Sequence, residues 1–187
     1  MKAPLSVLAI VCVLSSAPAF SQGGAAPTVA TDVTNADLQA AVKRGQQDLQ
    51  RPGGSLSDRL ISVADMGQYN VAVAMVTRTA SEKPSGAFSH LKITEVYYIL
   101  RGSGTQVTGT LVNGKGGGPD TLIGPTLSGN SPLENARSSR LGPGDVQIIP
   151  PGVAHAWSAI DAGGIDYLVY RIDPDHLLAM PKPRPTP

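Results

Sequence analysis

Two of the three histidines in this 187-residue chain stand in settings that suit metal chemistry. His90 precedes Glu95 by five positions, and Gly102 follows Glu95 after six intervening residues. His155 closes the stretch GDVQIIPPGVAH, in which a short apolar run is followed by a Pro-Pro-Gly turn. Imidazole and carboxylate groups are common ligands of transition metals, but a metal site needs a convergent set of them. Taken singly, His90 could equally cap a strand end, and His155 could be a hydrogen-bonded core residue.

The order and spacing of these residues resemble the two sequence motifs of the cupin family. The first family motif is His-x-His, three or four residues, Glu, six residues and Gly. The second is Gly, five residues, Pro-x-Gly, two residues and His. In this chain the second motif is complete from Gly144 to His155, with Ala159 in place of its closing Asn. The first motif is complete except that Phe88 replaces its first His. The resemblance covers about residues 60–173.

The resemblance implies an all-β fold, a double-stranded β-helix (jelly-roll) cupin barrel, with a metal bound inside by His90, Glu95 and His155. Full cupin sites use three histidines and one Glu, so Phe88 leaves three ligands here. Two imidazoles and one carboxylate with open positions suit non-haem iron(II), and manganese, nickel, copper and zinc are alternatives. We therefore expect one divalent transition metal. Because the family also includes metal-free members, a barrel without metal is the alternative.

Strand alternation predicts which other side chains face the site, because alternate residues of a strand share one face. The residues that share a face with the candidate ligands, and so form the predicted substrate pocket, are Phe88, Lys92, Tyr97, Arg101 and Trp157. Lys92 would either pair with the carboxylate ligand or bind an anionic substrate. For Tyr97 and Trp157, packing inside the barrel is the alternative to substrate contact.

The candidate residues lie on a succession of short predicted strands. These strands cover residues 69–79, 88–92, 95–100, 105–112, 145–149, 155–160 and 165–172, with Gly- and Pro-rich separators between them. Regular short strands with turn signals indicate a sandwich or a barrel. Residues 113–137 interrupt the rhythm, and 121–123 with 125–127 are predicted to form a short hairpin. A loop of this length is either functional or a tolerated insertion.

The barrel is expected over residues 58–175, after an N-terminal segment, 22–57, that contains a helix at 34–50. Thr34 and Asp37 resemble a capping box at the start of this helix. The C-terminal segment, 176–187, is Pro-rich, and we interpret His176 as a structural or exposed residue that opens a short helix at 177–180.

Residues 1–21 resemble a secretory signal peptide. Lys2 supplies a positive start, residues 5–14 are apolar, and small residues follow at 17–21. The apolar run is too short for a stable spanning helix, and the only cysteine, Cys12, lies inside it. We therefore expect a secreted or periplasmic protein without disulfides, and without a membrane partner after signal cleavage.

Charge and composition narrow the classes of partner. Without Lys2 the chain has 14 Lys and Arg residues against 14 Asp and Glu residues, and it has no basic stripe. This balance argues against nucleic acid and acidic membrane surfaces and favours a small-molecule substrate or ligand. Two functions remain open: a metal enzyme with dioxygenase or isomerase chemistry, and a non-catalytic module that binds a small ligand with or without metal.

A homodimer is also expected. Residues 70–76 have neither charge nor proline, so this strand would be poorly protected if it lay at a sheet edge. Either this strand or the helix at 34–50 is predicted to contact the second copy.

Overall fold

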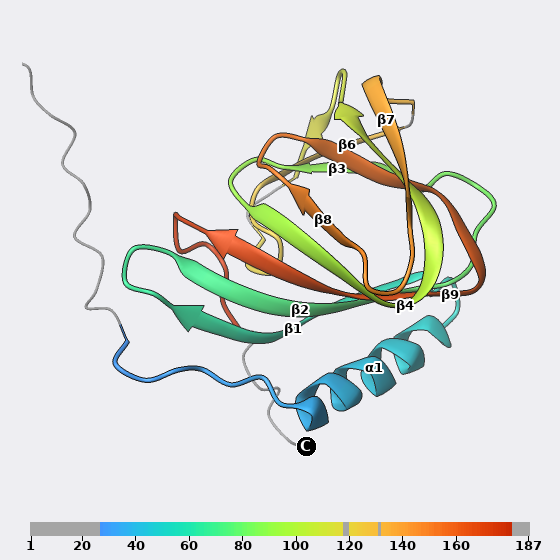
Figure 1. The fold of residues 1–187 in the computed structure, drawn as a ribbon. Helices are drawn as coiled ribbons and strands as arrows, with labels where there is room; N and C mark the ends of the chain where they lie inside the picture. The colour runs from blue at the N-terminus through green and yellow to red at the C-terminus, as the bar shows by residue number, and fades with distance from the viewer. Residues whose placement is uncertain (1–26, 118–119, 131, 181–187) are drawn as a thin grey trace, which may run out of the picture.

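The computed structural model describes residues 27–117, 120–130 and 132–180, so the expected signal segment at 1–21 and the chain end at 181–187 lie outside the described residues. The described residues form one helix and nine strands around an antiparallel barrel (Figure 1). The elements in chain order are α1 (Asn35–Leu49), β1 (Leu56–Asp65), β2 (Asn70–Arg78), β3 (Ala87–His90), β4 (Thr94–Thr110), β5 (Lys115–Gly116), β6 (Thr126–Gly129), β7 (Glu134–Leu141), β8 (Val146–Ile149) and β9 (Ala154–Asp173).

Helix α1 lies against the outside of the barrel, as predicted. Its capping box is present: the Thr34 hydroxyl accepts a hydrogen bond from the Asp37 backbone, and the Asp37 carboxylate accepts one from the Thr34 backbone. Ala41 packs on Met75 of β2 and Leu168 of β9, so α1 covers one outer sheet face (Figure 1). No helix in the described ranges is both long and apolar enough to cross a membrane.

The strands pair in the order β1-β2-β9-β3-β6-β5, and β4 pairs with β9, β8 and β7. The two longest strands, β4 and β9, pair with each other from one end of the barrel to the other. Each of them therefore belongs to both halves of the barrel, which is the arrangement expected of a double-stranded β-helix.

Each long strand corresponds to two predicted short strands. The glycines that were interpreted as separators bend the chain but do not end the strand. Gly102 in β4 has φ +74°, and a Cβ there would lie 1.9 Å from the carbonyl oxygen of Gly164 in β9. Gly164 has φ +78°. Only glycine permits both this backbone and this close approach. The bend therefore keeps β4 and β9 paired around the barrel.

Three further predictions need correction. Strand β1 was not expected, because its apolar alternation is broken by charged side chains. The hairpin of 121–123 with 125–127 is wrong: 121–123 form a turn, while β6 pairs with β3 and β5. Residues 177–180 form no helix, because the backbone of Leu178 donates to Asp173 and its side chain enters the core.

Residues 70–76, which would need protection at a sheet edge, do not lie at one. Strand β2 pairs with β1 on one side and with β9 on the other, so its backbone groups are occupied. The outer position belongs to β1, whose Asp58, Arg59 and Asp65 give it the charged character typical of protected edge strands.

The core fills most of the space between the two sheet layers. Its fully buried apolar residues include Ile93, Ile99, Ile165, Tyr167 and Val169. Buried charged groups lie beside this core, among them Glu95 and Arg171. Burying charge is costly unless the charges are paired, so this part of the interior is where a function is to be sought.

Candidate metal centre and its pocket

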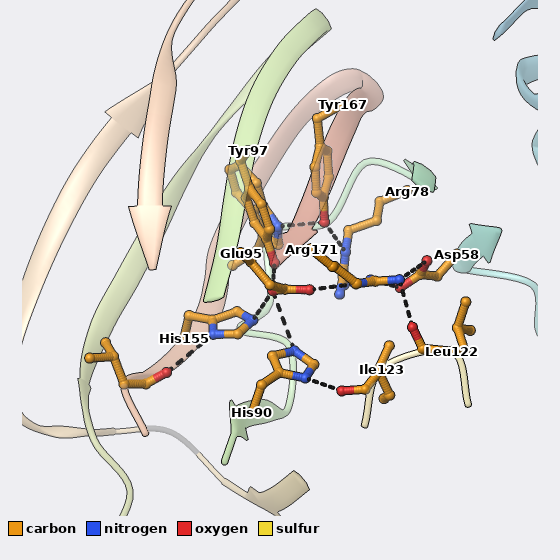
Figure 2. A network of polar contacts seen from close by, with 12 residues as sticks. Asp58, Arg78, His90, Glu95, Tyr97, Leu122, Ile123, His155, Tyr167 and Arg171 are labelled. Atoms are coloured by element: carbon orange, nitrogen blue, oxygen red, sulfur yellow. Dashed lines mark hydrogen bonds and ion pairs between the residues drawn. The ribbon is translucent and has the colours of Figure 1, made fainter. Parts of the chain in front are cut away.

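The three predicted ligands lie together inside the barrel (Figure 2). His90 ends β3, Glu95 lies near the start of β4, and His155 lies near the start of β9. The Glu95 Oε2 atom is 3.3 Å from Nε2 of His90 and 3.5 Å from Nε2 of His155. All three side chains are buried.

The second motif brings its histidine to the first motif through backbone contacts. The amide of Gly152, in the Pro-Pro-Gly turn, donates to the carbonyl of His90 over 2.8 Å. Two residues of β3 then pair with the beginning of β9, with Phe88 opposite His155. The turn residues therefore set the separation of the two imidazoles, which stack with ring centroids 5.3 Å apart.

Both histidines direct Nε2 toward Glu95 and Nδ1 toward a backbone carbonyl. Nδ1 of His90 lies 3.0 Å from the carbonyl of Ile123, and Nδ1 of His155 lies 3.4 Å from that of Val153. A carbonyl only accepts hydrogen bonds, so the tautomer that donates from Nδ1 to this carbonyl presents the Nε2 lone pair inward, which is the form that binds a metal. Burial lowers the pKa of His155 to about 4, which keeps that imidazole neutral near pH 7.

Three electron-pair donors therefore converge on one point, an arrangement that a cation stabilises. At metal–ligand distances of about 2.1 Å, neighbouring ligand atoms lie about 3.0 Å apart at right angles and about 3.4 Å apart at tetrahedral angles. The separation of 3.3 Å from Glu95 Oε2 to His90 Nε2 falls in this range, and the separation of 3.5 Å to His155 Nε2 lies slightly beyond it. The residues present thus fit a divalent transition metal held by two imidazoles and one carboxylate.

The Glu95 carboxylate is kept ionised by its neighbours. Burial raises its pKa, but the Arg171 guanidinium and the two imidazoles outweigh burial and lower the pKa to about 2. Nε of Arg171 donates to Oε1 over 2.9 Å, and the Tyr97 hydroxyl donates to Oε2 over 3.0 Å. Burial, with Glu95 next in effect, raises the pKa of Tyr97 well above its usual value, so its hydroxyl keeps its proton.

Arg171 lies at the centre of a buried ion network that joins β9 to β1 and β4. Its Nη1 donates to Asp58 Oδ1 and to the carbonyl of Leu122, each over 3.1 Å, and its Nη2 donates to Asp58 Oδ2. Burial lowers the pKa of Arg171, but Asp58 and Glu95 more than offset this, so the guanidinium stays charged. The turn at 121–123 therefore serves the site, because it supplies acceptors to both Arg171 and His90.

The candidate ligands border a cavity of about 80 Å³. Phe88 and Tyr97 line it, as predicted from strand alternation. The lining residues that were not predicted include Tyr167 of β9 and Arg78 at the end of β2, whose Nε donates to the Tyr167 hydroxyl over 3.2 Å. Tyr97 and Tyr167 lie against each other, with ring centroids 4.7 Å apart, and form part of the cavity wall.

The structure places the other three predicted pocket residues elsewhere. Strand β3 ends at His90, so Lys92 leaves the inward face; it is 57% exposed and pairs with Asp175 over 3.3 Å. A register shift between Ile99 and Arg101 turns Arg101 outward to Asp166. Trp157 is buried beside the cavity and donates to the Tyr167 hydroxyl over 3.3 Å, which is the packing role.

The pocket does contain two cationic groups, as expected, but they are Arg78 and Arg171 in place of Lys92 and Arg101. The sequence pattern of the strands could have identified both Arg78 and Arg171 as inward-facing residues. Arg78 continues the inward series of Ala72, Ala74 and Val76, and Arg171 interrupts the apolar series of β9. A charged residue at an inward position of an apolar strand marks a buried functional or paired group.

The fold and the site define a small antiparallel barrel with a candidate interior metal centre. A family model described as Cupin matches residues 68–177, which is more than half of the chain. The chain belongs to the cupin family. No curated protein sequence matches it.

Solved structures are similar in fold at low sequence identity. The DMSP lyase DddQ from Ruegeria pomeroyi aligns at 19% identity and a TM-score of 0.43, over 64% of this chain and 47% of that one. KdgF from Halomonas sp. aligns at 12% identity and a TM-score of 0.37, over 63% and 80%. An uncharacterised conserved protein from Klebsiella pneumoniae with a double-stranded β-helix domain aligns at 14% identity and a TM-score of 0.39. The alignment covers 70% of this chain and 86% of that one. The chain spans about half the length of DddQ.

The ion network predicts a large loss of stability on removal of its central charge. Arg171→Met leaves the buried Glu95 and the half-buried Asp58 without their partner, and we expect the free energy of unfolding to fall by about 3–5 kcal/mol. Urea denaturation followed by circular dichroism measures the change. Arg140→Met, which breaks an exposed pair with Asp161, is the matched control and should change stability much less. Equal losses in the two variants would contradict the assigned role of Arg171.

Proposed function

We propose that this chain is an exported cupin that holds one divalent transition metal with His90, Glu95 and His155. We propose further that it is an enzyme that acts on a small organic substrate by dioxygenase or isomerase chemistry. The observation that carries the proposal is the convergence of three buried electron-pair donors at the wall of a cavity. Ligands that close only one side of an ion leave positions at which a substrate can bind.

The protein's own groups supply position, charge and exclusion of water. When bound, a divalent metal at these ligands supplies Lewis-acid polarisation of a carbonyl or hydroxyl oxygen, or a site for dioxygen. Tyr97 keeps its hydroxyl proton on Glu95 Oε2 and so fixes the direction of that oxygen. Phe88, Val76 and Ile123 line the cavity with apolar surface, which keeps the reacting groups away from bulk water.

One observation favours the alternative of a non-catalytic ligand-binding barrel. The charge of Glu95 is already compensated by Arg171, so the ion network is satisfied without a metal. In that case a small ligand would bind in the cavity with or without metal, and chelation would leave its binding intact. The metal content of the native protein separates the two functions.

Native protein should therefore contain close to one transition metal per chain, because the three ligands define a single site. We expect His90→Ala and His155→Ala each to reduce the occupancy strongly. Elemental analysis of protein purified from the periplasmic or secreted fraction measures it, and N-terminal sequencing of the same sample should begin near Gln22. His176→Ala is the control, because His176 lies outside the site. Full occupancy in the His90/His155 double variant would contradict the ligand assignment.

Phe88 stands directly opposite His155 and lines the cavity, at the position where the family motif has a further histidine. Phe88→His should raise metal affinity, because it adds a fourth protein ligand. The affinity is measured by competition with a chelator of known strength. Unchanged affinity in a correctly folded variant would show that this side chain does not reach the metal.

Self-association is part of the proposal, but the structure suggests a different surface for it. Exposed apolar residues follow one another across the outer faces of β8, β4 and β9, beside the area that α1 covers: Val146, Ile148, Tyr98, Leu100, Tyr170 and Ile172. A contiguous apolar patch of this kind is typical of an interface. We propose that a second copy of the chain covers it.

A charge placed in this patch should separate the two copies. We expect Ile148→Lys to halve the molar mass in light scattering, because burying an unpaired ammonium is unfavourable. Val112→Lys adds the same charge at an exposed position outside the patch and should leave the mass unchanged. A monomeric native protein would reject the dimer.

A further inference from the structure

Arg78 is a pocket residue whose charge has no carboxylate partner among the described residues. Its Nε donates to the Tyr167 hydroxyl, and no ion pair is formed by its guanidinium. The outer nitrogens of Arg78 lie on the side of the Glu95–Arg171 pair (Figure 2), and all three residues border the same cavity. The donors left over by the protein therefore face the space that a ligand would occupy.

The two arginines of the pocket differ in their partners: Arg171 is paired with carboxylates, and Arg78 is not. Arg171 is held by Asp58 and Glu95, and a backbone carbonyl takes a further donor. Arg59, Arg101 and Arg140, which are more exposed, each contact a carboxylate as well. A guanidinium inside a pocket loses hydration, and its planar set of donors matches a carboxylate with two parallel hydrogen bonds.

The charges around the cavity indicate the sign of the missing partner. Asp58 and Glu95 balance Arg78 and Arg171 when both imidazoles are neutral. A divalent metal at the proposed site adds two positive charges, which are costly to bury without compensation. A bound anion that contacts Arg78 would offset this excess.

The cavity walls indicate the kind of anion. The space is about 80 Å³, and apolar side chains line much of it, among them Leu56, Val76, Phe88 and Ile123. A small acid with a short apolar body fits these walls better than a large polyanion does.

We infer that Arg78 is the anion-recognition residue of the pocket and that the ligand is a short-chain monocarboxylic acid. The carboxylate binds the outer nitrogens of Arg78, and the acid's short chain lies between the apolar walls. This inference deepens the proposed function and rests on it for the metal, but contact between Arg78 and the anion does not require the metal.

NMR titration of isotope-labelled protein tests the inference with three probes: propionate, its uncharged counterpart propionamide, and inorganic phosphate. Each titration is run on zinc-loaded and on EDTA-treated protein, with the zinc content measured. Propionate should bind native protein at least about tenfold more tightly than propionamide, because only the anion forms charge-assisted hydrogen bonds. Arg78→Met should weaken propionate binding by about tenfold or more. Arg137→Met removes an exposed arginine outside this cavity and should leave the affinity unchanged.

Arg78→Lys keeps the charge but loses the planar pair of donors, so it should bind propionate with intermediate affinity. If Arg78→Met does not fold, Arg78→Lys decides the test. Native propionate affinity in Arg78→Lys would then overturn the inference. Native affinity in folded Arg78→Met, equal binding of propionamide, tighter binding of phosphate, or no propionate binding in either preparation would also overturn it. A protein that takes up no zinc but binds propionate through Arg78 would instead reject the proposed metal function and retain this inference.

Discussion

Arg171 places a full positive charge inside the barrel, and the neighbouring side chains are arranged to compensate it. Its partners come from different strands, Asp58 from β1 and Glu95 from β4, while Arg171 itself lies on β9. Because a buried charge without a partner costs several kcal/mol, these strands must adopt their register together. The residue pair Glu95 and Arg171 is directly opposed in the β4–β9 ladder, so sheet register and charge pairing support each other. Strand β1 lies before residue 68, where the family match begins, yet it completes this network.

The same network gives the two oxygens of the Glu95 carboxylate different partners. Oε1 is held by Arg171, and Oε2 is left facing the two Nε2 atoms and the Tyr97 hydroxyl. A backbone carbonyl lies next to Nδ1 of each histidine, so these contacts orient the candidate ligands and favour the tautomer that binds a metal. The turn that supplies the carbonyl for His90 also supplies one for Arg171. Of the two interpretations left open for residues 113–137, a functional loop or a tolerated insertion, these contacts favour the functional one for the turn at 121–123.

Much of the site could be predicted from sequence because local spacing determines it. The Pro-Pro-Gly turn fixes where His155 enters β9, and strand alternation correctly placed Phe88 and Tyr97 at the cavity. Prediction failed where the direction of a side chain depends on a strand end or a register shift, which residue spacing does not show. Lys92 lies beyond the end of β3, and a register shift turns Arg101 outward. Gly102 looked like the end of a strand because its requirement for glycine comes from the approach of a distant strand.

Arg78 and Arg171 show a second limit of sequence-based prediction. Alternation indicates that each shares a face with buried apolar residues, but it does not reveal whether a partner lies across the barrel. Arg171 finds two carboxylates and Arg78 finds none among the described residues, although both stand at inward positions. Their contribution to the site depends on a three-dimensional charge balance that no single strand encodes.

This balance links the two proposals physically. The four charged residues around the cavity compensate one another, so a metal ion alone would leave an excess of positive charge and an anion alone an excess of negative charge. Each ligand therefore reduces the electrostatic cost of the other. Linkage requires the coupling to be reciprocal: if a carboxylate on Arg78 strengthens metal binding, the metal strengthens carboxylate binding by the same factor. A site in which Glu95 is already paired with Arg171 can thus hold its metal more firmly when the substrate is present, because the carboxylate lowers the excess of positive charge that the metal brings.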